Sequence, residues 1–368
     1  MQPGDTQRPL SLPAVLVRLM AIGVILCAAA ALFVYVGGWL SPDRRTQDRF
    51  MTAFDAHDGK HPGFRRNHAK GLCVTGWFDA AAEAAPLSRA AIFHLQRVPI
   101  VGRFALAGGM PFAADQAGTV RSMALRFLPI GAQEWRTGMN DIPVFPVNSN
   151  EGFYEQLRAS APDPATGKPD LEAMKDFLAR HPETVRAMQL IKARSISSGF
   201  ADDTYNSLDA FYLTNSSGVS VPVRWSAVAV QPFVADDAGA HAGAEKNYLF
   251  NDLLKQLESH ALKWRLVFTI GEAGDSTQDA TLAWPEERRR VVAGIVTIAR
   301  AVSEENGACT DINYDPMVLP DGIAPSDDPL LAARSSVYAR SFTLRSAEKS
   351  KKPASAVSPP VGMDGSAP

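Results

Sequence analysis

An unbroken apolar run extends from Leu19 to Leu40 and contains no charged residue. A run of this length can cross a bilayer, whereas a buried core helix rarely lacks every polar position. The pattern therefore predicts one N-terminal membrane anchor or secretion signal within residues 1–44. The small residues Ala28–Ala31 offer a cleavage site, but the apolar run continues past them, which favours an uncleaved anchor. Basic residues flank the run on both sides, so the positive-inside rule does not fix its orientation.

Residues 62–235 have mainly the pattern of short strands, in which β-prone segments are bounded by Gly, Pro, Asn or Asp. The predicted strands are Gly71–Phe78, Val101–Ala107, Thr119–Phe127, Ile142–Val147, Ala210–Thr214 and Val221–Val230. One helical segment, Asp170–Lys192, interrupts them.

From residue 245 to 347 the apolar positions recur with a helical period, which predicts helices at Tyr248–Leu262 and Glu286–Glu305. Strands followed by helices predict an α+β fold, with a large antiparallel sheet or barrel and a helical C-terminal part. Residues 348–368 are rich in Lys, Pro, Ser, Gly and Ala, so we expect a disordered tail there. The folded domain is then predicted to span residues 45–347.

Composition narrows the class of partner. Hydrophobic residues make up 46% of the chain and charged residues 21%, which suits a domain with a core. With 37 basic and 39 acidic side chains the net charge is −2, so nothing indicates nucleic-acid binding. Of the three cysteines, Cys27 lies in the apolar run. Cys73 and Cys309 are free to pair outside the cytoplasm, but the sequence does not decide whether they do.

The residues before the C-terminus have the features of a helix start, with Ser326 as the predicted N-cap and Pro329 in the first turn. Arg334 and Tyr338 are four residues apart and so share one helix face. A guanidinium beside a phenol favours the phenolate, which is a hard anionic ligand suited to ferric iron. Taken alone, such a pair is more often an ordinary amphipathic core tyrosine with its hydroxyl paired.

Two other segments offer polar groups. His68 stands in the segment Arg65–Gly71, before a β-prone stretch, and a neutral imidazole is the natural proton shuttle near pH 7. Asn140 places a side-chain amide shortly before Phe145. A lone histidine is more often a hydrogen-bonded structural residue, so neither segment decides a function by itself.

In combination these segments resemble the haem catalase family, and in particular its short members, the catalase-related peroxidases. The resemblance covers most of residues 60–347. Its densest matches are RxxHAKG at Arg65–Gly71, GRF at Gly102–Phe104, Asn140 ahead of Pro143-Val144-Phe145, and RxxxY at Arg334–Tyr338. Each match is weak singly, and the four in the family order carry the resemblance.

The resemblance implies a role for each matching side chain. His68 would be the distal acid–base residue, and Asn140 would orient the peroxide. Tyr338 would be the iron ligand, as a tyrosine is in catalase itself, and Arg334 would keep it ionised. The other implied haem contacts are propionate arginines and distal aromatics, namely Arg65, Arg103, Arg345, Phe145 and Phe153. The haem is expected to be of b type, because the chain has no CxxCH attachment motif.

The sequence departs from the family at several points. Asn67 replaces the small apolar residue that usually precedes the distal histidine, and we expect its amide to hydrogen-bond at the haem face. Ala105 replaces a serine whose hydroxyl steadies that histidine. Residues 120–123 lack the usual Asp-Pro. The long N-terminal arm and the wrapping segment of full catalases are also missing, which predicts a shorter and wider approach to the haem.

Together these features predict a haem peroxidase that reduces organic peroxides or hydrogen peroxide with a small organic electron donor. Two alternatives keep the haem chemistry: a true catalase, and an enzyme that converts fatty-acid hydroperoxides, which the polar Asn67 keeps open. Two others do not turn over peroxide: a haem carrier or sensor, and a haem-free binding module. The expected location is the periplasm or another extracytoplasmic space, with an inner-membrane anchor, as a monomer or small homo-oligomer.

Overall fold

The computed structural model describes residues 11–36, 46–163, 165–236 and 244–357. The chain divides into two compact units, Met1–Thr46 and Gln47–Pro368. In the first unit, helix α1 (Leu12–Val36) has 25 residues and no buried side chain. Its length and composition suffice to cross a membrane, as they would for a signal sequence. Residues 37–40 of the predicted apolar run lie outside the described residues.

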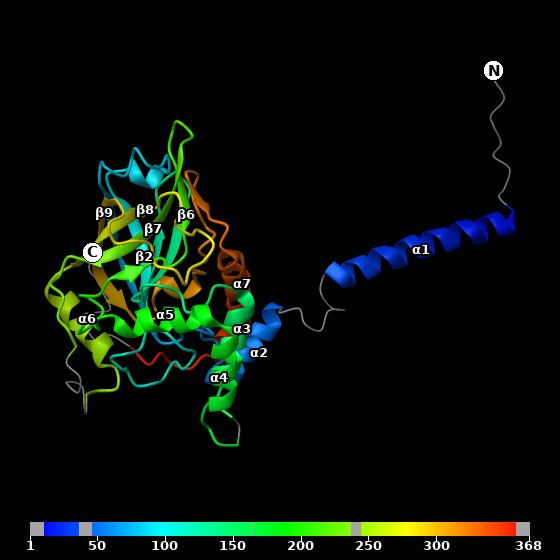
Figure 1. The fold of residues 1–368 in the computed structure, drawn as a ribbon, viewed down its shortest axis with the longest axis horizontal. Coiled ribbons are helices and arrows are strands. Elements are labelled where there is room, and N and C mark those ends of the chain that lie inside the picture. The colour runs from blue at the N-terminus through cyan, green and yellow to red at the C-terminus, as the bar shows by residue number, and fades with distance from the viewer. Residues whose placement is uncertain (1–10, 37–45, 164, 237–243, 358–368) are drawn as a thin grey trace. The chain divides into compact units, whose positions relative to one another are not determined.

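Ten strands of the second unit form one antiparallel sheet (Figure 1). They are β1 (Gly71–Ala80), β2 (Val98–Leu106), β3 (Arg121–Phe127), β4 (Trp135–Asn140), β5 (Tyr205–Asn206), β6 (Phe211–Thr214), β7 (Ser220–Ala229), β8 (Leu262–Ile270), β9 (Arg290–Val302) and β10 (Ile323–Pro325). The pairing of β7 with β8 closes a barrel in the order β7-β5-β4-β3-β2-β1-β9-β8, and β6 and β10 continue the sheet beyond it. The predicted antiparallel barrel is confirmed.

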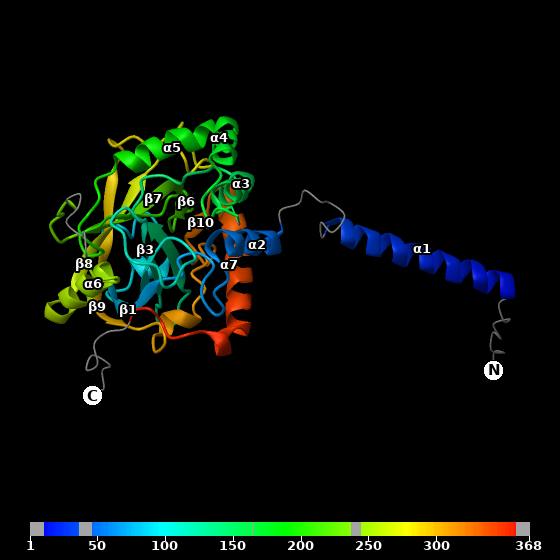
Figure 2. The ribbon, with the colours of Figure 1, turned by 90° about the horizontal axis from the view of Figure 1, so that it is seen from below.

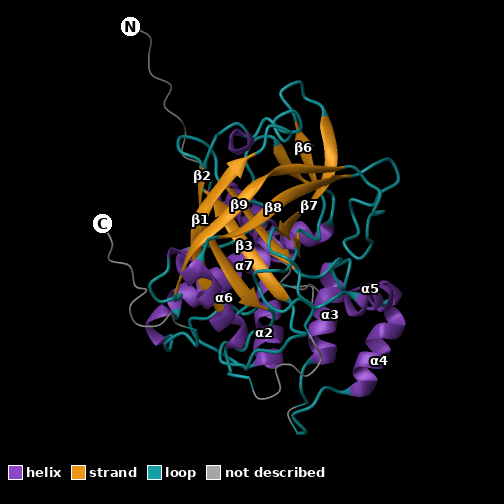
Figure 3. Cartoon of the chain, turned by 90° about the vertical axis from the view of Figure 1, so that its left-hand side faces the viewer, coloured by secondary structure: helices purple, strands orange, loops and turns teal. Residues whose placement is uncertain are grey.

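The helices of this unit gather mainly to one side of the curved sheet (Figure 3). They are α2 (Gln47–Asp58), α3 (Asn150–Ser160), α4 (Leu171–Arg180), α5 (Pro182–Ala193), α6 (Tyr248–Ser259) and α7 (Pro329–Ala347), with short 3-10 turns η1 (Ala91–Phe93), η2 (Ala308–Asp311) and η3 (Lys349–Lys351). Helices α2, α3 and α7 contact one another and lie side by side next to the barrel (Figure 2).

The two faces of the barrel strands differ in character. On β3, Met123, Leu125 and Phe127 point inward and are fully buried, as the period of two requires. Trp135 and Trp225 meet edge to face inside the barrel, with ring centroids 5.0 Å apart. Because such rings fill the interior, polar side chains that serve a ligand have to project from the outer face.

The outer face of three adjacent strands carries polar groups in register. Ala105 on β2 pairs with Ser122 on β3, which pairs with Asn140 on β4. Residues directly opposite each other in a sheet point to the same side. Arg103 lies two residues before Ala105 and therefore shares that side. The fold thus brings Arg103, Ser122 and Asn140 to one patch of the outer wall.

Two sequence predictions of secondary structure are wrong. Ile142–Val147 is not a strand, because Pro143 and Pro146 remove backbone donors that a sheet needs. Glu286–Glu305 is not a helix but contains β9, and the part at 245–347 that was predicted to be helical also holds the strands β8 and β10. The pairing of β9 shifts register once against β1 and once against β8. These irregularities break the alternation of buried residues, which hides the strand period from sequence inspection.

Other boundaries differ from the predictions in smaller ways. The predicted helix at 170–192 is two helices, since Pro182 begins α5. The N-cap of α7 is Asp328 rather than Ser326, whose hydroxyl instead donates to the Thr277 carbonyl. Part of the predicted tail is ordered, because residues 349–357 include η3 and end on Val357, which is 2% exposed. Residues 358–368 lie outside the described residues.

A disulfide joins Cys73 on β1 to Cys309 in η2, with Cα atoms 5.4 Å apart and a sequence separation of 236. It settles the pairing that the sequence left open. A Cβ on Gly307 would lie 2.4 Å from the Cys73 sulfur, so the turn before Cys309 needs a glycine to approach β1. The crosslink therefore fixes the segment after β9 against the barrel.

Removal of this disulfide is expected to lower the free energy of unfolding by about 2–5 kcal/mol, because it closes a long loop of the unfolded chain. The measurement is chemical denaturation of the full chain carrying Cys73→Ala and Cys309→Ala. Cys27→Ala, which removes the free cysteine of α1, is the matched control and should leave the transition unchanged. An unchanged transition in the double variant would contradict the prediction.

Candidate active site

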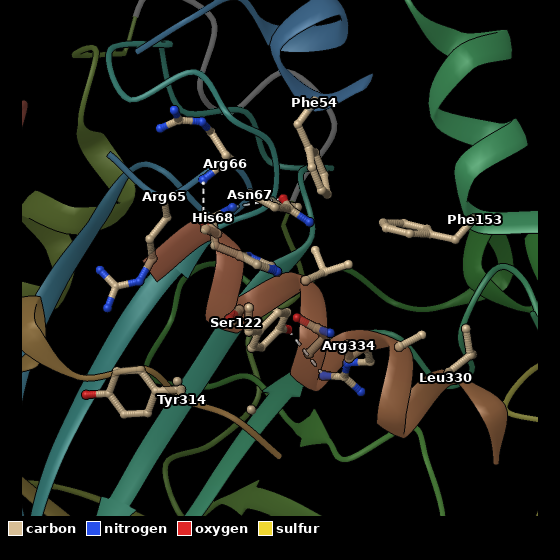
Figure 4. A pocket seen from close by; sticks show the side chains of 18 of the residues that line it. Phe54, Arg65, Arg66, Asn67, His68, Ser122, Phe153, Tyr314, Leu330 and Arg334 are labelled. Carbon is tan, nitrogen blue, oxygen red and sulfur yellow. Dashed lines mark hydrogen bonds between the residues drawn. The ribbon is translucent and has the colours of Figure 1, made fainter. Parts of the chain in front are cut away.

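A cavity of about 280 Å³ lies between the outer wall of the barrel and helices α2, α3 and α7. All ten residues predicted to form the site line it: Arg65, Asn67, His68, Arg103, Asn140, Phe145, Phe153, Arg334, Tyr338 and Arg345. The close view in Figure 4 shows several of these side chains converging on one space from different elements. The structure therefore brings together every residue of the predicted site.

One side of the cavity is formed by α7. As the spacing predicted, Arg334 and Tyr338 lie on one helix face, and Arg334 Nη2 is 3.5 Å from the tyrosine oxygen. Arg334 Nη1 also donates to the carboxylate of Asp209. Burial lowers the pKa of Arg334, but Asp209 and Tyr338 outweigh burial and raise it. The guanidinium is thus a permanent cation between a phenol and a buried carboxylate.

Asp209 was not identified from the sequence. It is fully buried just before β6, and burial raises its pKa although Arg334 and Arg224 oppose this. The preceding residue, Leu208, has a φ of 67°, in the left-handed region that most side chains avoid. The strained backbone places Asp209 against Arg334, and strain of this kind concentrates at functional sites. A charged residue directly before a β-prone run was the available signal.

His68 also lines the cavity, from the loop before β1. Its φ is 54°, also in the left-handed region, which histidine tolerates better than most residues. Its Nδ1 atom is buried without a hydrogen-bond partner among the described residues. Burial, Arg103 and Arg334 lower the pKa of His68 to about 3. The imidazole is therefore neutral at ordinary pH and able to accept a proton.

Asn67 holds the His68 backbone in place. Its Oδ1 atom accepts hydrogen bonds from the backbone N–H groups of His68 and Gly108, each at 2.8 Å. The prediction placed the amide at the haem face. In the structure its oxygen is used by the loop itself, while the residue still lines the cavity. These two hydrogen bonds explain why an asparagine occupies this position instead of the expected apolar residue.

Asn140 completes the polar part of this wall. Its Oδ1 atom is buried without a hydrogen-bond partner in the described part of the chain. The register places it beside Ser122, which also lines the cavity and pairs with Ala105. Ala105 offers no hydroxyl to His68, which agrees with the unpaired Nδ1 atom. The wall therefore presents an amide and an imidazole whose hydrogen-bonding capacity the protein leaves partly unused.

Three arginines gather at another side of the cavity. Burial, together with Arg103 and Arg345, lowers the pKa of Arg65 to about 9. Burial lowers the pKa of Arg345 to about 10. Both values stay above 7, so the guanidiniums remain charged. Gly71 gives Arg103 its room, because a Cβ there would lie 2.3 Å from the Arg103 Cζ atom. Buried cations that lower one another's pKa in this way indicate a site for an anionic ligand.

The remaining wall is aromatic. Phe54 from α2 and Phe153 from α3 point into the same space (Figure 4), with ring centroids 6.0 Å apart. Phe145 lies 5.9 Å from Phe153 and beneath the guanidinium of Arg334. Phe54 was not identified from the sequence, because α2 adjoins the predicted anchor and carries no motif. The cavity combines a flat apolar lining with charged groups at its edges.

The other charged residues of the motif RxxHAKG form ion pairs, and one of them, Arg66, also lines the cavity. Arg66 is 5% exposed and donates to both carboxylate oxygens of Glu348, at 2.9 and 3.0 Å. Lys70 donates to Asp115 at 2.6 Å. These ion pairs tie the loop that carries His68 to the C-cap of α7 and to the segment between β2 and β3. The motif thus supplies both cavity residues and ion pairs that hold its loop in place, and the sequence alone does not show which residue does which.

Comparison with known proteins agrees with this architecture. A family model described as catalase matches residues 49–352. The catalase-related peroxidase of Synechococcus elongatus is 37% identical over 306 residues, which is 82% of this chain and 88% of that protein. The catalase-related peroxidase of Mycolicibacterium paratuberculosis is 32% identical over 311 residues, which is 82% of this chain and 95% of that protein.

Among solved structures, a fungal catalase superimposes with a TM-score of 0.69 at 19% sequence identity. The match covers 94% of this chain and 66% of the fungal protein. At this identity the likeness concerns the fold alone. The chain therefore spans just under two thirds of that catalase but most of the two shorter relatives.

Proposed function

The chain belongs to the catalase family, and on this basis we propose that it binds haem in the cavity and reduces organic peroxides or hydrogen peroxide with a small organic electron donor. Its relatives place it among oxidoreductases that act on peroxide. The observation that carries the finer proposal is the meeting of all ten predicted residues around one cavity. Haem of b type fits, because the chain has no CxxCH motif for covalent attachment.

The cavity suits haem in three respects. A phenol held beside Arg334 offers an anionic oxygen ligand for ferric iron. Arg65, Arg103 and Arg345 offer cations for the two propionates. Phe145, beneath Arg334, offers a flat apolar contact for the macrocycle. We assign Tyr338 as the iron ligand on this donor set. Bound haem supplies the redox chemistry, and the protein supplies ligand, orientation and access.

His68 and Asn140 are proposed to handle the peroxide. A neutral imidazole takes the proton from the near oxygen of the peroxide and returns it to the leaving oxygen. The pKa of His68, lowered to about 3 by burial and by the nearby arginines, keeps the imidazole neutral and ready for the first of these transfers. The amide of Asn140 donates a hydrogen bond that orients the peroxide and stabilises developing charge.

The aromatic lining favours peroxidase over catalase activity. Phe54 and Phe153 come from two different helices and present ring surface to the space beside Asn67 and His68 (Figure 4). Such a lining accommodates an organic hydroperoxide or an aromatic donor, which gains by burying apolar surface. Hydrogen peroxide gains nothing from it. We therefore place donor-dependent reduction ahead of dismutation of hydrogen peroxide.

We further propose that the enzyme works outside the cytoplasm on a membrane anchor. Helix α1 has the length and composition of a single membrane span. The Cys73–Cys309 disulfide is typical of an oxidising compartment such as the periplasm. The net charge of −2 gives no reason to add a nucleic-acid partner. The expected partners are a peroxide, an organic donor and the membrane.

The test uses the full chain, purified in detergent with haem supplied. A haem absorption band, followed by donor oxidation on addition of hydrogen peroxide or an organic hydroperoxide, supports the proposal. Oxygen release from hydrogen peroxide without donor oxidation identifies a true catalase. Product from a fatty-acid hydroperoxide without donor consumption identifies a hydroperoxide-converting enzyme. Absence of the haem band rejects the haem proposal altogether.

Asn67 provides a more specific prediction. Asn67→Ala removes the acceptor for two backbone N–H groups in the loop that carries His68. We expect the rate constant for reaction with peroxide to fall by about 10- to 100-fold, a range typical of residues that orient reacting groups from behind. Haem content should stay at the wild-type level. Stopped-flow spectroscopy of the haem-loaded enzyme measures the rate.

Asn150→Ala is the matched control, since Asn150 also lines the cavity but holds no part of the His68 loop. Its rate constant should remain within about threefold of wild type, as a change below 1 kcal/mol implies. Equal effects of the two substitutions would contradict the positioning role of Asn67.

A further inference from the structure

Glu304 lies just after β9 and touches two of the three arginines of the cavity. It is 3% exposed. Its Oε1 atom accepts hydrogen bonds from Arg103 Nε at 2.6 Å and Arg65 Nη1 at 3.2 Å. Both arginines line the cavity, whereas Glu304 does not. The carboxylate therefore supports them from outside the space that a ligand would occupy.

Backbone carbonyls of the same segment complete the support. The carbonyls of Cys309 and Ile312 each accept from Arg65 Nη2 at 3.0 Å. The Ile312 carbonyl also accepts from Arg345 Nη2 at 3.1 Å. Because the disulfide holds Cys309 against β1, these acceptors are fixed in position. Glu304 adds the one negative charge that the carbonyls lack.

The support uses only part of each guanidinium. Arg103 Nη1, Arg65 Nε and Arg345 Nε make no hydrogen bond to any residue that the structure describes. Donors with no protein acceptor on residues that line a cavity are available to a ligand. Each arginine is thus held by one set of donors and leaves another for the ligand.

Charge points to the kind of ligand. Three guanidiniums face one buried carboxylate, which leaves an excess of two positive charges. Arg103 and Arg65 lower the pKa of Glu304 to about 2 against the opposing effect of burial, so the carboxylate stays ionised. Lys352 is also within electrostatic reach of Glu304, and Glu305 offsets part of its charge. A ligand with two carboxylates balances the excess.

We propose that Glu304 is a positioning residue, a resident counter-ion that holds Arg65 and Arg103 ready for the two carboxylates of the ligand. The inference rests on the proposed function, in which the two carboxylates are the haem propionates. Without Glu304, the buried guanidiniums repel one another until the ligand arrives. With it, the site is ordered in advance, and binding costs less reorganisation.

The experiment compares thermal unfolding of the full chain with and without haem. In Glu304→Gln the midpoint of the haem-free protein should fall at least about twice as far as that of the haem-loaded protein, because only the latter has propionates to replace the lost charge. Glu304→Asp, which keeps the charge, should reduce this difference between the haem-free and the haem-loaded protein. Glu305→Gln is the matched control, because Glu305 is exposed, accepts from the Ser355 backbone N–H and makes no hydrogen bond to the three arginines in the described part of the chain. It should shift the midpoints of the haem-free and haem-loaded proteins equally.

If Glu304→Gln shifts the unfolding midpoint equally with and without haem, Glu304 has only a structural role, and the inference is overturned. The position of the haem band should be the same as in wild type, since Tyr338 is untouched. A wild-type protein that shows no haem band would reject the proposed function and this inference with it. A normal band with equal shifts would reject the inference alone.

Discussion

Replacing Tyr338 with phenylalanine is expected to change or abolish the haem absorption band and to lower donor oxidation by more than about 100-fold, which exceeds the effect typical of residues that only support a metal ligand. The physical reason is the loss of the anionic oxygen that Arg334 faces at 3.5 Å. Phenylalanine keeps the ring and therefore the packing of α7. Absorption spectra of the haem-loaded wild type and variant provide the measurement, followed by the peroxide assay with donor.

Tyr314→Phe is a matched control for this experiment. Tyr314 lines the same cavity and is 6% exposed, and its hydroxyl is 3.4 Å from the Val101 carbonyl. Loss of this hydroxyl should leave the haem band where it is in wild type. A Tyr338→Phe protein with full haem content and an unchanged spectrum would mean that another group holds the iron, and the roles proposed for the residues of the cavity would have to be assigned again.

The parts of the site that were predictable are those set by local spacing or by the family motifs. Arg334 and Tyr338 share a helix face because a helix repeats after 3.6 residues, and no tertiary contact is needed to foresee it. His68 and Asn140 were found through their motifs. Their convergence on one cavity depends on strand register, which a single sequence does not determine.

The supporting charges were not predictable in the same way. Glu304 meets Arg103 across 201 residues of sequence, and Asp209 meets Arg334 across 125. Contacts at such separations follow from the closed barrel and leave no local pattern. Glu304 was further concealed because it follows a strand that was interpreted as a helix. Neither carboxylate lines the cavity, but each forms an ion pair with an arginine that does.

Errors in the fold prediction have a similar origin. The apolar positions of β9 do not alternate regularly, because its pairing shifts against both neighbours. The segment 142–147 is rich in β-prone residues but contains Pro143 and Pro146. Its backbone forms a hydrogen bond outside the strand ladders, in which the Phe145 N–H donates to the Ala280 carbonyl. Composition identified apolar segments correctly, while backbone hydrogen bonding decided their structure.

The second large effect is expected at His68. His68→Asn should lower the rate constant for reaction with peroxide by about 100- to 10,000-fold, the range for loss of a general acid–base group. Asparagine is the suitable replacement, because it too adopts the left-handed backbone that His68 has at a φ of 54°. Haem content and the haem band should be retained. His94→Gln, at a histidine that contacts the Ser88 carbonyl outside the cavity, is the control and should be without effect.

The pH dependence tests the same assignment. Because burial and nearby arginines lower the pKa of His68 to about 3, the neutral imidazole persists well below the usual value of 6.5, and the wild-type rate constant should stay level from pH 7 to pH 5. The buried carboxyl of Asp141, next to Asn140, has a pKa raised to about 7 by burial and by Asp203. Burial and Asp209 also raise the pKa of Asp328 to about 7. An inflection near pH 7 that survives in His68→Asn therefore belongs to a buried carboxyl, Asp141 or Asp328, and not to His68. A fall centred near pH 6.5 in wild type that disappears in His68→Asn would show that His68 titrates as an ordinary histidine, and its role as a base in a dry, arginine-lined cavity would be wrong.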